Sequence, residues 1–234
     1  MAHLDLSAAV AASREERLAA WQQVQGRLSL LLRAIEGGAA GMAPPPGGRS
    51  AAAARHQLKA LISSWAGHVI SAHIVSPYEH MSWSVTNMED LSQRHAPPEH
   101  YRHIIGLLRL TAAQQQTIAQ GLTVFHELLL SLKEEQTRLQ QQMLQLQAAH
   151  APPGAPAGAH SLLQRVETNN WQLSWMICLL NFFISGVLDL PQLCKCTVHS
   201  YPWPWWPGPF AEEVLHLYQQ QQQQQQQQLV NGQA

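Results

Sequence analysis

The sequence predicts an all-α protein whose centre is an antiparallel hairpin of two long helices, at about residues 112–147 and 161–188. Two observations lead to this fold class. Apolar residues recur in alternating steps of three and four along both segments, the spacing of a helix that faces one partner along its length. A linker rich in Pro, Gly and Ala at residues 148–160 separates the segments and allows the chain to turn back. We therefore expect a protein that works by helix pairing.

The N-terminal region, residues 1–36, is expected to contain one amphipathic helix that starts near residue 7. Gly37 and Gly38 are expected to end it. The Pro- and Gly-rich residues 37–50 form a linker, which could make this helix an independent unit. The apolar positions of the helix again advance in steps of three and four: Trp21, Val24, Leu28, Leu31 and Ile35.

Residues 51–147 are expected to form a helical region that ends in the first long helix. A helix is predicted at 51–74, because Pro77 disfavours helical geometry in the residue before it. Pro98 can open a short helix, and Thr111 can cap the long one. The predicted interface residues of the long helix are Leu122, Phe125, Leu129, Leu132, Gln136, Leu139 and Met143.

The C-terminal helical region, residues 161–218, starts with the second long helix. Asp189 is expected to cap a short helix at about 190–199. Pro209 can then open a last helix that runs through Tyr218. The predicted interface residues of the second long helix are Leu163, Val166, Asn170, Leu173, Ile177, Leu180, Ile184 and Val187.

An antiparallel hairpin of this kind pairs Phe125 with Ile184 and places Gln136 and Asn170 in adjacent layers. There the two polar side chains could hydrogen-bond to each other, which would lower the cost of burying them. The alternative is that both meet water at the edges of the interface and merely set its register. A parallel homodimer through residues 118–146 is a further alternative, although Phe125 is a poor choice for a dimeric zipper.

Three tryptophans, Trp203, Trp205 and Trp206, stand between prolines in the segment YPWPWWPGP. We expect them to form an aromatic staple that holds the last short helices against the rest of the fold. Alternatively, the segment is a polyproline-type motif that a partner recognises. The ten glutamines that begin at Gln219 predict a disordered tail over residues 219–234 or, alternatively, an extension of the last helix, and their composition is prone to self-association.

Composition argues against a nucleic-acid-binding or secreted protein. Only 14 Lys and Arg stand against 15 Asp and Glu, so no basic surface for phosphate contacts is expected. Three cysteines are too few for a disulfide scaffold, which favours a nuclear or cytoplasmic location. The N-terminus also lacks the apolar core of a secretory signal.

No motif in the sequence predicts catalysis or a cofactor. Cys194, Cys196 and His199 have the order of a partial zinc site, but residues two apart on a helix point in different directions. His100 and His103 stand one helical turn apart, which is expected by chance in a chain with 13 histidines. We therefore expect a protein that is not an enzyme and binds no metal or cofactor.

One segment could instead anchor the protein in a membrane. The run WMICLLNFFISGVL starts at Trp175 and is interrupted by Asn181 and Ser185. A spanning helix needs about 20 predominantly apolar residues, and shorter runs are more often buried helices. A membrane-tethered coiled-coil protein anchored through residues 171–190 is therefore the alternative, and a buried helix is preferred.

Two stretches resemble the region that follows the basic leucine zipper in green-algal bZIP transcription factors. They are residues 110–143 (LTAAQQQTIAQGLTVFHELLLSLKEEQTRLQQQM) and 182–214 (FFISGVLDLPQLCKCTVHSYPWPWWPGPFAEEV). The resemblance implies an accessory helical region of a transcription regulator. No DNA-contacting residue can be carried over, because the basic helix of that family has no counterpart ahead of Ile118. We expect a helical protein-interaction module, related to transcriptional regulation, whose partner is another protein or a second copy.

Overall fold

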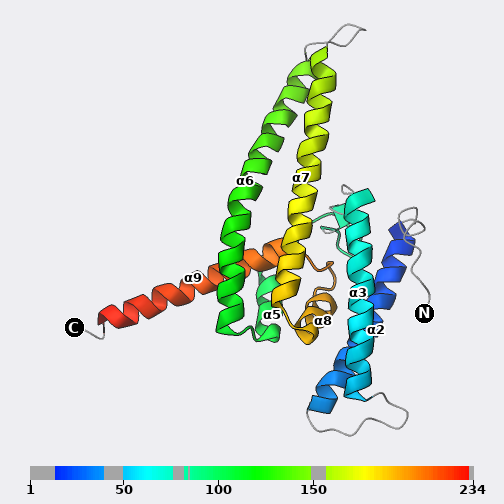
Figure 1. The fold of residues 1–234 in the computed structure, drawn as a ribbon, viewed down its shortest axis with the longest axis vertical. Coiled ribbons are helices and arrows are strands. Elements are labelled where there is room, and N and C mark those ends of the chain that lie inside the picture. Colours follow the sequence, from blue (N-terminus) through cyan, green and yellow to red (C-terminus); the bar gives the residue numbers. More distant parts are fainter. Residues whose placement is uncertain (1–13, 40–49, 76–81, 84, 149–156, 232–234) are drawn as a thin grey trace.

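The computed structural model describes residues 14–39, 50–75, 82–83, 85–148 and 157–231. Helices dominate these residues, and the β-structure among them is an isolated bridge between Thr86 and Gln93. The prediction of an all-α fold is therefore confirmed (Figure 1). The helices are α2 (Arg14–Ala39), α3 (Ala51–Val75), α5 (Pro98–Leu108), α6 (Ala112–Ala148), α7 (Ala157–Val187), α8 (Leu190–His199) and α9 (Pro207–Asn231).

The two longest of the described helices, α6 and α7, form the expected antiparallel hairpin. They pack against each other and extend beyond the remaining helices as an arm (Figure 1). Helix α7 begins at Ala157, four residues before the predicted start, so part of the expected linker is helical. Residues 149–156 lie outside the described residues, as do residues 1–13 and 40–49 of the other predicted segments.

The largest cluster of buried apolar side chains, the α5–α9 core, lies at the base of the arm. Helices α5, α6, α7, α8 and α9 all contribute to it. Its most completely buried members have 2% of their surface exposed or less: Ile104, Ile118, Leu122, Leu180, Ile184, Cys196, Phe210, Ala211 and Val214.

A second cluster, the α2–α3 core, joins the N-terminal helices to the body. It contains Leu28, Leu31, Leu32, Ile35, Ala54, Leu58 and Cys194. The alternative that the linker makes the first helix an independent unit is excluded, because α2 packs on both α3 and α8. The predicted apolar face of this helix is nevertheless correct: Trp21, Leu28, Leu31 and Ile35 are buried and Val24 is half-buried. The helix ends at Ala39 and so passes through Gly37 and Gly38.

Local capping interactions explain where several helices begin. Asp189 accepts a hydrogen bond from the backbone of Gln192, whose side chain accepts one from the backbone of Asp189, which forms a capping box for α8. Thr111 and Gln114 make the same reciprocal pair of hydrogen bonds at the start of α6. Pro98 stands in the first turn of α5, where its missing N–H has no helical acceptor.

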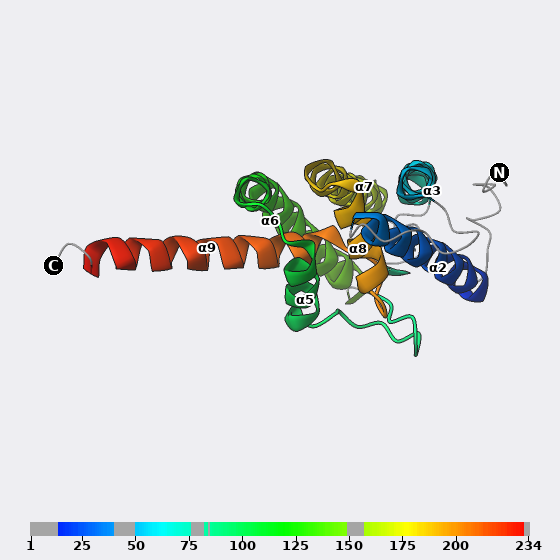
Figure 2. The same ribbon diagram turned by 90° about the horizontal axis from the view of Figure 1, so that it is seen from below.

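The glutamine tract is helical as far as Asn231, so the disordered tail is wrong there and the alternative of a helical extension is correct. Helix α9 projects from the body, and its glutamines are exposed (Figure 2). Phe210 and Val214 in the first turns of α9 are buried in the α5–α9 core. This packing stabilises the first turns and so offsets the unfavourable nucleation of the helix. Glutamine is a good helix former, and each added residue then only extends an existing helix.

Candidate functional site

The interface between α6 and α7 contains most of the residues that the repeat pattern predicts. Leu122, Leu139, Leu173, Ile177, Leu180 and Ile184 are buried, and Phe125, Leu129, Leu132, Gln136, Met143, Val166, Asn170 and Val187 are half-buried. One prediction is wrong. Leu163 has 51% of its surface exposed, whereas its neighbour Leu162 has 7%.

The error at Leu163 follows from the periodicity of a straight helix. One series of buried or half-buried positions runs along the whole of α7: 162, 166, 169, 173, 177, 180 and 184. They repeat every 11 residues, close to the natural 3.6 residues per turn, whereas a heptad repeat requires 3.5. Since the heptad pattern fits the C-terminal half of α7, its extrapolation drifts by one residue at the N-terminal end.

A polar layer crosses the middle of the arm. Gln136 Nε2 lies 3.4 Å from Asn170 Oδ1, so the two polar residues of the predicted interface do contact each other. Asn169, which the heptad pattern did not include, is more deeply buried, and its Nδ2 donates to the carbonyl of Leu132 at 3.3 Å. At the edge of the same layer, Arg165 forms an ion pair with Glu135 at 2.7 Å. These contacts fix which residues of α6 and α7 face each other.

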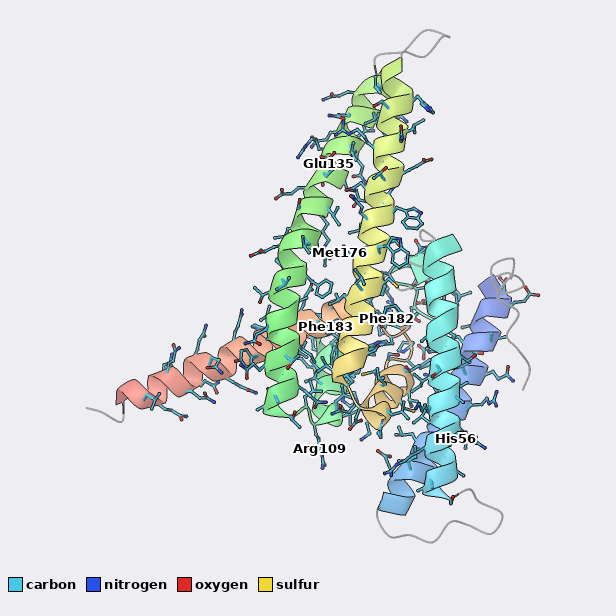
Figure 3. All side chains as sticks on the ribbon, in the orientation of Figure 1. His56, Arg109, Glu135, Met176, Phe182 and Phe183 are labelled. Carbon is cyan, nitrogen blue, oxygen red and sulfur yellow. The ribbon has the colours of Figure 1, made fainter. Side chains whose placement is uncertain are left out.

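Near the base of the arm, aromatic side chains of α6 and α7 pack against each other. The rings of Phe125 on α6 and Phe183 on α7 are 5.8 Å apart. The ring of Phe183 also covers Gly121, where a Cβ atom would overlap it. Figure 3 shows Phe183 on the side of α7 that faces α6, and Phe182 on the side toward α3. Adjacent residues of α7 thus face two different surfaces.

The three predicted staple tryptophans contact different parts of the fold. Trp203 Nε1 donates to the carbonyl of Arg94 at 3.0 Å, and its ring meets His100 edge-on at 5.1 Å. The ring of Trp205 packs edge-on against Phe210 of α9 at 4.8 Å. Trp206 lines a cavity between the two cores. The Trp-Pro segment therefore contacts both α5 and α9, in agreement with the predicted role of an aromatic staple.

The cavity has a volume of about 130 Å³ and is lined by α2, α3, α7, α8 and the Trp-Pro segment. Its aromatic walls include Trp21, Trp65, Trp83, Trp205 and Trp206. No lining residue is ionisable, and the polar side chains among them are Asn181, Ser185 and Thr197. The sequence did not predict this cavity, since its walls come from segments far apart in the chain.

An apolar stripe runs along the outer face of α7. It consists of Trp171, Trp175, Leu179 and Phe182, with exposed fractions of 37–49%. These residues follow one another at steps of four, four and three, so they share one face of the helix. The rings of Trp171 and Trp175 lie 5.5 Å apart. We call this set the α7 stripe; its last member also lines the cavity.

The cysteines and histidines do not form a reactive centre among the described residues. Cys178, Cys194 and Cys196 are buried free thiols, and burial raises the pKa of all three, in the case of Cys194 to about 12. Such thiols are poorly reactive, because the thiolate is the nucleophile and the metal ligand. In the part of the chain that the structure describes, no group of three His, Cys, Asp or Glu residues is arranged to hold a metal ion.

Comparison with known proteins finds no matching family model, no significantly similar curated protein and no significantly similar solved structure.

Proposed function

We propose that this protein is a non-enzymatic helical interaction module that docks a partner on the α7 stripe. The observation that carries the proposal is the exposure of two tryptophans, a leucine and a phenylalanine along one helix face. Large contiguous apolar patches on a protein surface typically mark interaction sites. Tryptophan is also enriched among the residues that contribute most to binding energy at interfaces.

The geometry of the stripe favours a helical partner. Its residues recur at the spacing by which one amphipathic helix packs against another. The upper part of α7 extends beyond α3 (Figure 3), and all four side chains of the stripe are 37–49% exposed. A partner helix with its own apolar face, from another protein or from a second copy of this chain, would cover it.

We further propose a role in transcriptional regulation, with the nucleus preferred over the cytoplasm. The support is the resemblance of residues 110–143 and 182–214 to the region after the zipper in green-algal bZIP factors, together with the glutamine tract. The near-zero net charge of -1 favours an indirect role, through a protein that itself contacts DNA.

The alternative of an anchor through residues 171–190 required a spanning helix. Among the described residues, which include this segment, no helix combines the length and the apolar character needed to cross a bilayer.

The proposal is tested with two double variants of the full chain. Trp175→Gln/Leu179→Gln changes the stripe, and Leu144→Gln/Leu163→Gln changes two exposed leucines elsewhere on the arm. Sedimentation equilibrium tests self-association, and quantitative affinity capture from nuclear extract tests other partners. We expect the stripe variant to lose the dimer or the captured protein, while the control variant keeps it. Equal behaviour of wild type and both variants would overturn the proposal.

A further inference from the structure

Asn181 and Ser185 are the two polar side chains in the apolar C-terminal part of α7, from Trp175 to Val187. These two residues interrupt the run WMICLLNFFISGVL, the longest apolar run around this helix. They stand four residues apart and therefore lie on the same face of α7. Both line the cavity between the two cores. Both side chains are half-buried, and a helix that only filled space here could carry apolar side chains at these positions, where a polar group needs a hydrogen-bond partner.

The remaining walls define what could fit beside this polar pair. They are dominated by aromatic rings, which offer flat apolar surfaces. No charged side chain lines the cavity, so a charged ligand would lose its hydration without gaining a partner. The volume of about 130 Å³ is close to the roughly 150 Å³ of engineered apolar cavities that bind benzene. One ring of benzene size therefore matches the space.

We propose that this cavity is a binding site for an uncharged aromatic ring that carries one hydrogen-bonding group. The ring packs among Trp21, Trp65 and Trp206, and its polar group lies against Asn181. Ser185 Oγ already lies 3.5 Å from Asn181 Oδ1. We therefore assign Nδ2 of Asn181 as the donor to the ligand. This site is separate from the α7 stripe, although Phe182 belongs to both.

The probes for the test are 4-fluorophenol and fluorobenzene, which share a ring and differ in the hydroxyl group. Ligand-observed fluorine NMR on the full chain measures both. We expect dissociation constants on the order of 1 mM, as is usual for ligands of this size. The phenol should bind about fivefold more tightly, which corresponds to one net hydrogen bond.

Three variants assign the effect to the cavity. Asn181→Leu should remove the preference for the phenol and retain the binding of fluorobenzene. Ser185→Leu should weaken both probes at least tenfold, because the added methyl groups occupy the space. Ser131→Leu, at an exposed position on α6, is the matched control and should bind like the wild type.

Three results would overturn the proposal. In the first, the wild type binds neither probe at a probe concentration of 10 times the expected dissociation constant. In the second, it binds both probes with equal affinity. The third such result is that Asn181→Leu still binds 4-fluorophenol more tightly than fluorobenzene. If Ser185→Leu fails to fold, the comparison of wild type with Asn181→Leu still decides. Loss of partner binding in the stripe variants has no bearing on these outcomes, so the two proposals fail separately.

Discussion

Cys194 and Cys196 lie two residues apart on α8, yet their side chains belong to different hydrophobic clusters. Cys194 lies in the α2–α3 core, where its thiol donates to the carbonyl of Leu28 at 3.5 Å. Cys196 lies in the α5–α9 core with none of its surface exposed. Because one short helix contributes to both clusters, it joins the N-terminal helices to the arm.

The first prediction concerns the reactivity of these thiols. At pH 8 the raised pKa values of Cys178, Cys194 and Cys196 leave each thiol almost entirely protonated, and burial keeps reagents away. We expect all three to react with 5,5′-dithiobis(2-nitrobenzoate) at least a hundredfold more slowly in the native protein than in guanidinium. A thiol that reacts at the denatured rate in native buffer would contradict the burial described above.

The second prediction compares two adjacent leucines at the N-terminal end of α7. Leu162→Ala should lower the free energy of unfolding by about 2 kcal/mol, because the side chain is buried against α6. Leu163→Ala should change it by less than about 0.5 kcal/mol, because that side chain is exposed. Urea unfolding followed by circular dichroism measures both. A larger loss of unfolding free energy for Leu163→Ala than for Leu162→Ala would contradict the structure, because it would mean that Leu163 faces α6, as the heptad pattern predicts.

The third prediction concerns Gly121 beneath the ring of Phe183. In Gly121→Ala the new methyl group must displace that ring from its contact with Phe125, and overpacking of this kind costs about 1–3 kcal/mol. The gain in helix propensity offsets about 1 kcal/mol of this cost. We expect a net loss in the free energy of unfolding.

Gly26 provides the matched control for Gly121. It also lies within a helix, but a Cβ atom there would meet nothing within 4 Å. Gly26→Ala should therefore stabilise the protein by about 0.5–1 kcal/mol. If both alanine variants stabilise it, the close approach of Phe183 to α6 is not maintained in solution.

The fourth prediction is a decrease in stability in mild acid. Burial lowers the pKa of His100 below its usual 6.5, a hydrogen bond with the backbone of Ser200 opposes this, and the charge of His103 adds to it. As the pH falls below 6.5, the unfolded chain takes up a proton that the native state resists. Stability is then lost until the native pKa is reached. The pKa of His199 is lowered in the same direction, mainly by burial.

Urea midpoints measured between pH 5 and 8 test this pH dependence. His100→Gln should flatten the decrease below pH 6.5, and His56→Gln, at an exposed position on α3, serves as the control. A profile for His100→Gln that stays parallel to the wild type would show that His100 is not responsible.

Much of the architecture follows from local sequence signals. The hairpin, the cap at Asp189, the start of α5 at Pro98 and the buried face of α2 were all predicted correctly, because each depends on spacing or on residues close in sequence. The one-residue shift at Leu163 was not, since it depends on how closely two particular helices follow a straight path.

In the candidate sites, too, features set by local sequence were predicted, and features set by contacts between distant segments were not. Asn181 and Ser185 were recognised as interruptions of an apolar run, but their common position on a cavity depends on α2, α3 and α8, which approach α7 from distant parts of the chain. The α7 stripe could not be predicted from the sequence for a related reason. A long run of apolar residues does not reveal which of its faces will be covered, and only the packed structure separates Phe182 from Phe183.

The glutamines of α9 continue a helix whose first turns are fixed in the α5–α9 core by Phe210 and Val214. The tract consequently forms a helical spacer that projects from the body (Figure 2). Each inserted glutamine would move the chain terminus outward by about 1.5 Å and rotate it by about 100° around the helix axis. Changes in tract length would therefore alter both the reach and the facing direction of whatever the C-terminus carries.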